Sequence, residues 1–532
     1  MQSNQQSLEM HPSRWGDPAR AQALPDEARA MVELVFGTDD RPAVEEPPLA
    51  PLAIDTAVLA ALAEAVGAEH VRTDDDTRRL RTRGKSTPDL LRVRAGDLTD
   101  APDAVVRPGS HDEVAAVLAL AVEHHLAVVP FGGGTSVTGG LVARREGFAG
   151  VLSLDLVRMK RLVSVDHTSM TAVLEPGLRG PEAEALLAAE GVTLGHYPQS
   201  WEYASIGGFA ATRSSGQSSA GYGRFDSLVV GLTVATPRGR IDLGSAPANA
   251  AGPDLRQLFL GSEGAFGVIT SVTVRVRRLP AVKVYEGWRW PSFAAGAAAM
   301  RTLAQSGLLP TVLRLSDEAE SALNLADPAA IGVSAGSTTE AGGCLMITGY
   351  EGEPAAVEAG RAAVTAVLAG LGGTNVGTAP GEKWVHGRFD APYLRDSMLD
   401  AGVLVETLET ATFWSNLERL YADVKAALAT ALGDPSIVLC HISHVYETGC
   451  SLYFTVAARE GDDALAQWQA AKAAASDAMI AAGATITHHH AVGTDHKPWF
   501  AREIGPLGVS VLRAVKADLD PTGVLNPGVM VP

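Results

Sequence analysis

Pro130-Phe131-Gly132-Gly133-Gly134-Thr135-Ser136-Val137-Thr138-Gly139-Gly140 directly follows an apolar segment, 126–129, that is typical of a buried strand. Three consecutive glycines let the backbone approach a ligand without an intervening Cβ atom and leave N–H groups free to bind an anion. A Walker loop would end in Lys-Ser or Lys-Thr, and a dinucleotide fingerprint would place its third glycine at Val137, so neither template fits. Taken alone, the stretch predicts either a pyrophosphate-binding loop or a glycine-rich surface turn.

Composition limits the class of protein. The chain has 532 residues, of which 46% are hydrophobic and 20% charged, which predicts two or three globular domains. A net charge of -18 argues against nucleic-acid binding. Three scattered cysteines, Cys344, Cys440 and Cys450, cannot form a disulfide framework and favour a cytoplasmic location. Neither a signal segment in 1–10 nor an 18-residue uncharged apolar run occurs, so we expect no membrane anchor.

Hydrophobic periodicity predicts two successive α+β regions. Ser110 and Glu113 have the spacing of a capping box, which predicts a helix beginning at Ser110. Around it we expect strands 104–107, 126–130 and 151–156, a hairpin over 162–174, a helix over 181–190, and strands 229–236 and 268–278. Further along, Ala-rich helices are expected over 294–306, 354–371, 417–432 and 464–482, with strands over 344–349, 437–444 and 451–457. A short helix over 25–36 precedes both regions, and one more helix is expected after 488.

Two further motifs follow the glycine run. The second is Gly195-His196-Tyr197-Pro198-Gln199-Ser200-Trp201-Glu202-Tyr203-Ala204-Ser205-Ile206-Gly207-Gly208 with Thr212-Arg213-Ser214-Ser215-Gly216, and the third is Gly261-Ser262-Glu263-Gly264-Ala265-Phe266-Gly267-Val268-Ile269. In this order, the three resemble the flavin domain of the vanillyl-alcohol oxidase and p-cresol methylhydroxylase superfamily. The second motif and the run His488-His489-His490 before Val492-Gly493 resemble the alkyldihydroxyacetonephosphate (alkylglycerone-phosphate) synthases within it.

The resemblance implies an α+β fold in which FAD lies between two subdomains, without a Rossmann unit. We expect residues 1–100 to form an N-terminal extension and the start of the FAD domain, and 101–280 the p-cresol methylhydroxylase-type FAD-binding domain. Residues 281–487 are expected to form a cap domain for the substrate. The segment 488–532 is expected to return to the FAD domain.

The expected FAD site combines all three motifs. Backbone N–H groups of 132–136 would bind the pyrophosphate, and short hydroxyls would meet ribityl and phosphate oxygens. Many relatives carry a histidine at Thr135 that bonds covalently to the flavin, so we expect non-covalent FAD. The candidate cofactor residues are Pro130, Phe131, Gly132, Gly133, Gly134, Thr135, Ser136, Gln199, Ser200, Ser205, Thr212, Arg213, Ser214, Ser215, Glu263, Gly264, Gly267, Val268 and Ile269.

The resemblance also implies an activity, the exchange of the fatty acid of an acyl-dihydroxyacetone phosphate for a fatty alcohol. In that family the three-carbon unit is thought to be held as an adduct at flavin N5, without net oxidation. Tyr453 matches the catalytic tyrosine, although a tyrosine in an amphipathic strand is the alternative. Arg395 and Arg314 match arginines that are important for activity, and a guanidinium suits phosphate; for Arg314 the alternative is an ion pair with Asp317.

Histidines complete the candidate catalytic set. The cluster at 488–490 could lower the pKa of Tyr453 or relay its proton. In an extended segment His488 and His490 would face one side and His489 the other, so a common site requires the backbone to turn. His196 is either a hydrogen-bonding partner of flavin or substrate, or a core histidine.

A flavin-dependent 2-hydroxy-acid dehydrogenase or oxidase of the D-lactate or glycolate type is the alternative function. Such relatives also end in a stretch like 520–528, and many bind a divalent metal through two strand histidines and a later Glu-His-Gly. The second strand histidine is missing here, so we predict no metal, with His444, Glu447 and one histidine of 488–490 as the alternative ligand set. We further expect a small-molecule lipid or hydroxy-acid substrate, a homodimer, and peripheral contact with a membrane surface.

Overall fold

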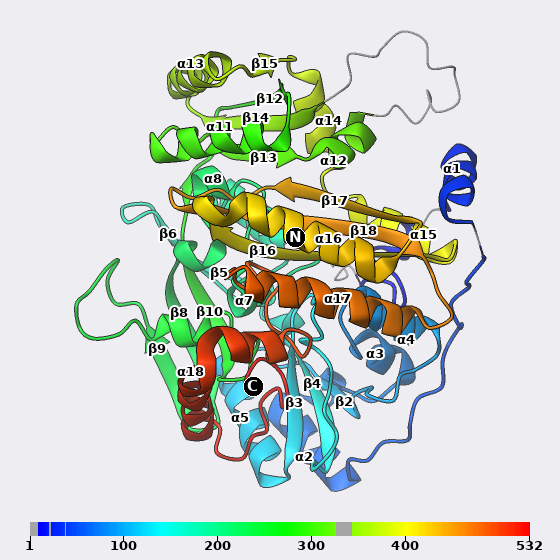
Figure 1. Cartoon of the computed structure of the whole chain (residues 1–532). Coiled ribbons are helices and arrows are strands. Elements are labelled where there is room, and N and C mark those ends of the chain that lie inside the picture. The colour runs from blue at the N-terminus through cyan, green and yellow to red at the C-terminus, as the bar shows by residue number, and fades with distance from the viewer. Residues whose placement is uncertain (1–8, 21–22, 38, 326–342) are drawn as a thin grey trace.

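The computed structural model describes residues 9–20, 23–37, 39–325 and 343–532. The first eight residues, where no signal segment is expected, lie outside these ranges. The described chain contains three larger sheets with helices packed on them, which confirms the α+β prediction. In Figure 1 the largest sheet and its helices occupy the upper half, above the two smaller sheets.

The first sheet carries the glycine loop. Its strand order is β1 (Val71–Arg72), β2 (Ala104–Val106), β4 (Gly150–Asp155) and β3 (Leu126–Phe131), and both β2 and β3 run parallel to β4. Helix α5 (His111–Glu123), capped by the Ser110 side chain as expected, packs with α2 (Thr56–Val66) over this sheet. The glycine loop therefore leaves the carboxyl end of β3, the edge where ligands bind in open parallel sheets.

The second sheet is antiparallel and supports the other two motifs. Its order is β5 (Leu162–Asp166), β6 (Thr171–Leu174), β10 (Val268–Arg275), β8 (Val229–Thr236) and β9 (Gly239–Leu243), so the predicted hairpin over 162–174 is present. Around it lie α6 (Gly180–Ala189), α7 (Ile206–Thr212), α8 (Ser219–Tyr222), α9 (Phe225–Leu228), α10 (Arg256–Phe259) and the pair β7 (Val192–Thr193) and β11 (Arg277–Arg278).

The third sheet has seven antiparallel strands. The order is β15 (Thr374–Asn375), β12 (Val282–Trp290), β14 (Cys344–Gly352), β13 (Val312–Ser316), β17 (Ser436–Ile442), β18 (Gly449–Arg459) and β16 (Val403–Phe413). Strands β12, β13, β15 and β16 were not predicted. The alternation of β16 is broken by buried acidic residues, Glu406 and Glu409, which resemble solvent-facing positions when read from the sequence alone.

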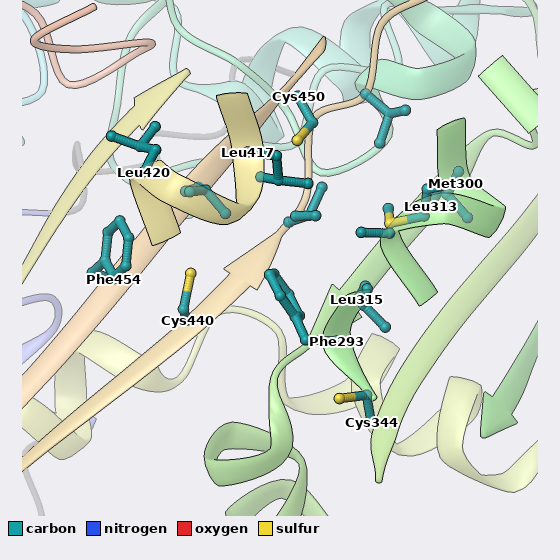
Figure 2. Close-up of a cluster of buried hydrophobic side chains, with 14 of the residues drawn as sticks. Phe293, Met300, Leu313, Leu315, Cys344, Leu417, Leu420, Cys440, Cys450 and Phe454 are labelled. Carbon is teal, nitrogen blue, oxygen red and sulfur yellow. The ribbon is translucent and has the colours of Figure 1, made fainter. Parts of the chain in front are cut away.

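The Ala-rich helices cover one face of this sheet and build its core. They are α11 (Phe293–Gln305), α13 (Pro354–Gly370), α16 (Leu417–Leu432) and α17 (Ala464–Ala481), each within two residues of the prediction. Figure 2 shows Phe454 and Cys440 on the strands gathered with Leu420 of α16. The three cysteines are buried and free, as expected.

The remaining helices join the parts of the fold. They are α1 (Asp26–Phe36), α3 (Asp75–Leu80), α4 (Thr87–Arg94), α12 (Glu318–Leu325), α14 (Ala379–Gly387), α15 (Ala391–Asp400) and α18 (Lys497–Leu519). After α18 the chain returns to the first sheet, where Val128 N–H donates to the carbonyl of Val524 and Leu525 bridges to the same strand. Across the described ranges, no helix is both long and apolar enough to cross a membrane.

Candidate functional site

A cavity of about 360 Å³ is enclosed jointly by the three motifs, α15 and the strands β16–β18. All predicted cofactor residues except Arg213 line it. Arg213 instead ends α7 in a left-handed conformation, and its guanidinium binds the carbonyls of Leu260 and Gln257 and the carboxylate of Asp226. Its role is therefore to hold the loop that presents Ser214 and Ser215.

The loop needs glycines because its backbone lies very close to residues of the second motif. A Cβ atom on Gly132 would lie 2.3 Å from the Ser205 hydroxyl, and one on Gly133 would lie 2.1 Å from the Tyr203 carbonyl. Gly134 has a φ of +71°, which also disfavours a side chain. The loop thus lies directly on the second motif, and the open space on its other side is the cavity.

The third motif links the loop to the C-terminal segment. The Glu263 carboxylate accepts hydrogen bonds from the N–H groups of Val492 (3.1 Å) and Gly493 (2.8 Å). Asn526 donates its side-chain amide to the carbonyls of Gly140 and Glu263. Burial raises the pKa of Glu263 to about 7, against the opposing effect of the two N–H donors.

This arrangement fits a flavin nucleotide. Residues 132–136 line the cavity together with the second motif, and Gln199 has a buried amide nitrogen on the cavity without a hydrogen-bond partner in the described chain. Residues 132–136 would hold the diphosphate, while Ser200, Ser205 and Thr212 offer hydroxyls along the same wall.

Tyr453 projects from β18 to the cavity wall. Its ring is stacked on His441 (centroids 4.8 Å apart) and lies near His489 (6.0 Å) and His490 (5.5 Å). Burial raises its pKa to about 12, so the expectation that the histidines lower it is wrong. The hydroxyl is protonated at neutral pH.

The triple histidine does turn, and Glu409 of β16 is the reason. This fully buried carboxylate accepts hydrogen bonds from the backbone N–H groups of His488 (2.7 Å), His489 (3.1 Å) and His490 (2.9 Å), and from the Thr487 hydroxyl (2.5 Å). Burial alone would raise the pKa of Glu409, but the three imidazoles and the hydroxyl outweigh it and hold that pKa well below its usual range.

The turn separates the three side chains. His489 and His490 line the cavity, whereas His488 lies behind it, stacked on His444 and bonded to the Tyr446 hydroxyl (2.6 Å). Burial lowers the pKa of His490 to about 4, and also lowers the pKa of His489. Both are neutral imidazoles at neutral pH, able to accept a proton.

Both predicted arginines reach the cavity, each beside a carboxylate. Arg314 contacts Glu320 and His441, each at 3.0 Å, rather than Asp317. Arg395 binds Asp396 and the carbonyl of Lys85. Two guanidinium groups on the cavity wall suit a phosphate or carboxylate.

His196 does not reach the cavity. It is packed against Phe209 and Phe225, with its Nε2 3.1 Å from the Ser214 hydroxyl, and burial lowers its pKa to about 3. It is a core histidine that supports Ser214. Glu320, His441 and Glu409 were not predicted from the sequence. Strand pairing places His441 on β17 and Glu409 on β16 next to β18, and α12, which follows β13, brings Glu320 to His441.

Another cluster lies beside the cavity. One ring nitrogen from each of His444, His488 and His489 falls within 4.8 Å of the others, a spacing that could hold a metal ion. The Nδ1 of His444 is bonded to the hydroxyls of Ser215 (3.0 Å) and Ser219 (2.7 Å), which leaves its Nε2 for a ligand. Glu447 is exposed and outside this cluster, so the alternative set containing it is wrong.

Comparison with known proteins agrees with this geometry. Residues 102–243 match the family model described as FAD binding domain, and 279–530 match FAD linked oxidases, C-terminal domain. The chain is 34% identical over 483 residues to the alkyldihydroxyacetonephosphate synthase of Dictyostelium discoideum (87% of this chain, 79% of that one), and 35% identical over 495 residues to that of Trypanosoma brucei brucei (88% and 80%). A solved alkyldihydroxyacetonephosphate synthase structure superposes with a TM-score of 0.84 over 98% of both chains, at 30% identity.

Proposed function

Because the chain belongs to the alkyldihydroxyacetonephosphate synthase-like FAD-linked oxidases, we propose that it exchanges the acyl group of an acyl-dihydroxyacetone phosphate for a fatty alcohol. One observation carries the proposal: Tyr453, His489 and His490 open onto the same cavity as the glycine loop and two arginines. In the exchange an ester C–O bond breaks and an ether C–O bond forms. The fatty acid leaves as the alcohol enters, and no net oxidation occurs.

The protein residues then have distinct tasks. Arg395 and Arg314 bind the phosphate through paired N–H donors. Neutral His489 or His490 accepts a proton from the three-carbon unit, and the protonated Tyr453 hydroxyl donates a hydrogen bond to the departing or entering oxygen. When bound, FAD would supply an electrophilic ring next to these groups.

The test is product identification. Palmitoyl-dihydroxyacetone phosphate with labelled hexadecanol should give a labelled ether, and a panel of 2-hydroxy acids added without oxygen should leave the flavin oxidised. Flavin bleaching by a hydroxy acid, together with no ether, would overturn the proposal.

The histidine cluster favours the second candidate, oxidation of a 2-hydroxy acid with a metal held by His444, His488 and His489. Metal bound stoichiometrically by the purified protein, lost in His444→Ala together with hydroxy-acid-dependent bleaching, would support it. A metal-free protein that makes the ether would exclude it.

We also propose that the flavin is dissociable, that the protein is a cytoplasmic homodimer, and that it touches a membrane surface when taking up fatty substrates. Thr135 on the cavity wall supports the first point, since its hydroxyl forms no bond to a flavin ring carbon as a histidine would. Acid precipitation should release FAD into the supernatant. Light scattering and vesicle flotation test the other two.

A further inference from the structure

Residues 9–20, here called the N-terminal strap, lie across the junction between the FAD domain and the cap. On the FAD side, Glu9 forms a paired hydrogen bond with Arg81 (2.8 and 2.9 Å), and Asp17 N–H donates to the Tyr203 hydroxyl (2.8 Å). On the cap side, Arg14 binds Asp400 (2.5 Å). The strap is therefore anchored to both halves of the site.

At the centre of the strap, Trp15 is pinned to the cavity. Its backbone N–H donates to Asp396, the carboxylate that also holds Arg395. Its ring meets the Tyr203 ring edge-on at 5.7 Å, and the carbonyl of Tyr203 is the atom that a side chain on Gly133 would strike. Trp15 thus stands between the glycine loop and the predicted anion-binding arginine.

The indole N–H of Trp15 is the unexplained group. The side chain lines the cavity and is only 4% exposed, yet its Nε1 has no hydrogen-bond partner among the described residues. A buried donor without a partner is unfavourable by about 1–3 kcal/mol. Several described tryptophans have an unpartnered Nε1, but of these Trp15 is the one that lines the cavity, where a ligand oxygen can accept its hydrogen bond. The glycine loop and Arg395 line the same cavity, and both favour an anionic oxygen.

We propose that the strap is part of the ligand site and that Trp15 Nε1–H donates to a phosphate oxygen in the cavity. The phosphate belongs either to the flavin diphosphate or to the substrate. If the phosphate is that of FAD, the proposal depends only on membership of the FAD-binding family. If it is that of the substrate, the proposal also rests on the proposed function. In both, Trp15 is a binding residue contributed by a segment outside the FAD-binding and cap sheets.

The test is Trp15→Phe, which keeps an aromatic ring against Tyr203 and removes only the N–H. Release of FAD from the holoprotein on dilution, followed by flavin fluorescence, should show about tenfold weaker binding if the partner is the flavin diphosphate. If the partner is the substrate phosphate, FAD affinity stays unchanged and calorimetric binding of dihydroxyacetone phosphate weakens by a similar factor. No change in either affinity overturns the proposal.

Trp468→Phe is the matched control, because Trp468 is equally buried with an unpartnered Nε1 but lies in the cap core away from the cavity. An equal loss of FAD in this control would also overturn the proposal.

If Trp15→Phe fails to fold, Arg14→Ala releases the strap from Asp400 and leaves the indole intact. Weaker FAD or dihydroxyacetone phosphate binding in that variant supports the proposal, and unchanged binding of both refutes it. If the wild-type protein retains FAD but does not bind dihydroxyacetone phosphate, the proposed function is contradicted. The role of Trp15 is then tested only by comparing the FAD affinity of Trp15→Phe with that of the wild-type protein.

Discussion

Replacing Glu409 by glutamine should loosen the turn that presents the catalytic histidines. In the wild-type protein Oε1 accepts three hydrogen bonds, from the Thr487 hydroxyl and the N–H groups of His489 and His490, and Oε2 accepts the His488 N–H. A glutamine oxygen can replace Oε1 and keep three bonds. Its NH₂ group must then replace Oε2. Both this group and the His488 N–H are donors, so the hydrogen bond between them is lost.

The magnitude follows from this one mismatch. A hydrogen bond to a charged acceptor contributes about 1.5–3 kcal/mol, and a buried N–H left unpaired is unfavourable by about 1–3 kcal/mol. The sum is about 2.5–6 kcal/mol, which for a cap of roughly 200 residues corresponds to a fall in melting temperature on the order of 10 °C. Displacement of His489 and His490 by even part of an ångström should also lower kcat by about a factor of ten or more.

Differential scanning calorimetry of the FAD-loaded protein measures the first effect, and ether formation the second. Glu353→Gln is the control, because Glu353 is exposed at the start of α13 and its side chain forms no cap hydrogen bond. A melting temperature of Glu409→Gln within 2 °C of that control would show that the carboxylate does not organise the turn.

Three further outcomes are expected. Tyr453→Phe should be folded, yellow and inactive, since only the hydroxyl on the cavity wall is lost; near wild-type turnover would remove Tyr453 from the mechanism. Gly133→Ala should lose FAD on gel filtration because its Cβ would strike the Tyr203 carbonyl, whereas Gly360→Ala, with nothing within 4 Å, should retain FAD. Burial raises the pKa of Glu263 to about 7, so the wild-type protein should lose about 3 kcal/mol of stability as pH rises from 4.5 to 7. Urea titrations across this pH range should show no such loss of stability in Glu263→Gln. The same dependence of stability on pH in the wild-type protein and in this variant would contradict the raised pKa of Glu263.

The sequence predicted the elements whose residues act locally. The Ser110 cap, the glycine loop and the Ala-rich helices each depend on neighbours within a few positions, and each lies within two residues of its predicted place. The domain boundaries at 100, 280 and 487 stay a prediction, as do the catalytic roles.

The features that the sequence did not predict are side-chain contacts, burial and pKa values. These depend on residues that lie far away along the chain. Arg213 and Ser215 are two residues apart in one motif, yet one binds loop carbonyls and the other faces the cavity, a difference set by the left-handed conformation of Arg213. The pKa of Tyr453 rises rather than falls because burial, which a sequence does not display, exceeds the opposing effects of Thr407 and Arg314. Glu409 resembles a surface residue until β16 is placed beside β18.

The contact of Asn526 with Gly140 and Glu263 bears on the order of events during synthesis. The loop is translated early, but the residue that fixes it emerges almost 400 positions later. Domains generally fold as they leave the ribosome, N-terminal parts first, and contacts this far apart form late. We therefore expect a nascent chain to acquire its early sheets with the nucleotide cradle still open, and to capture FAD only once Asn526 has emerged and closed the loop, so that flavin supply governs the yield of holoprotein.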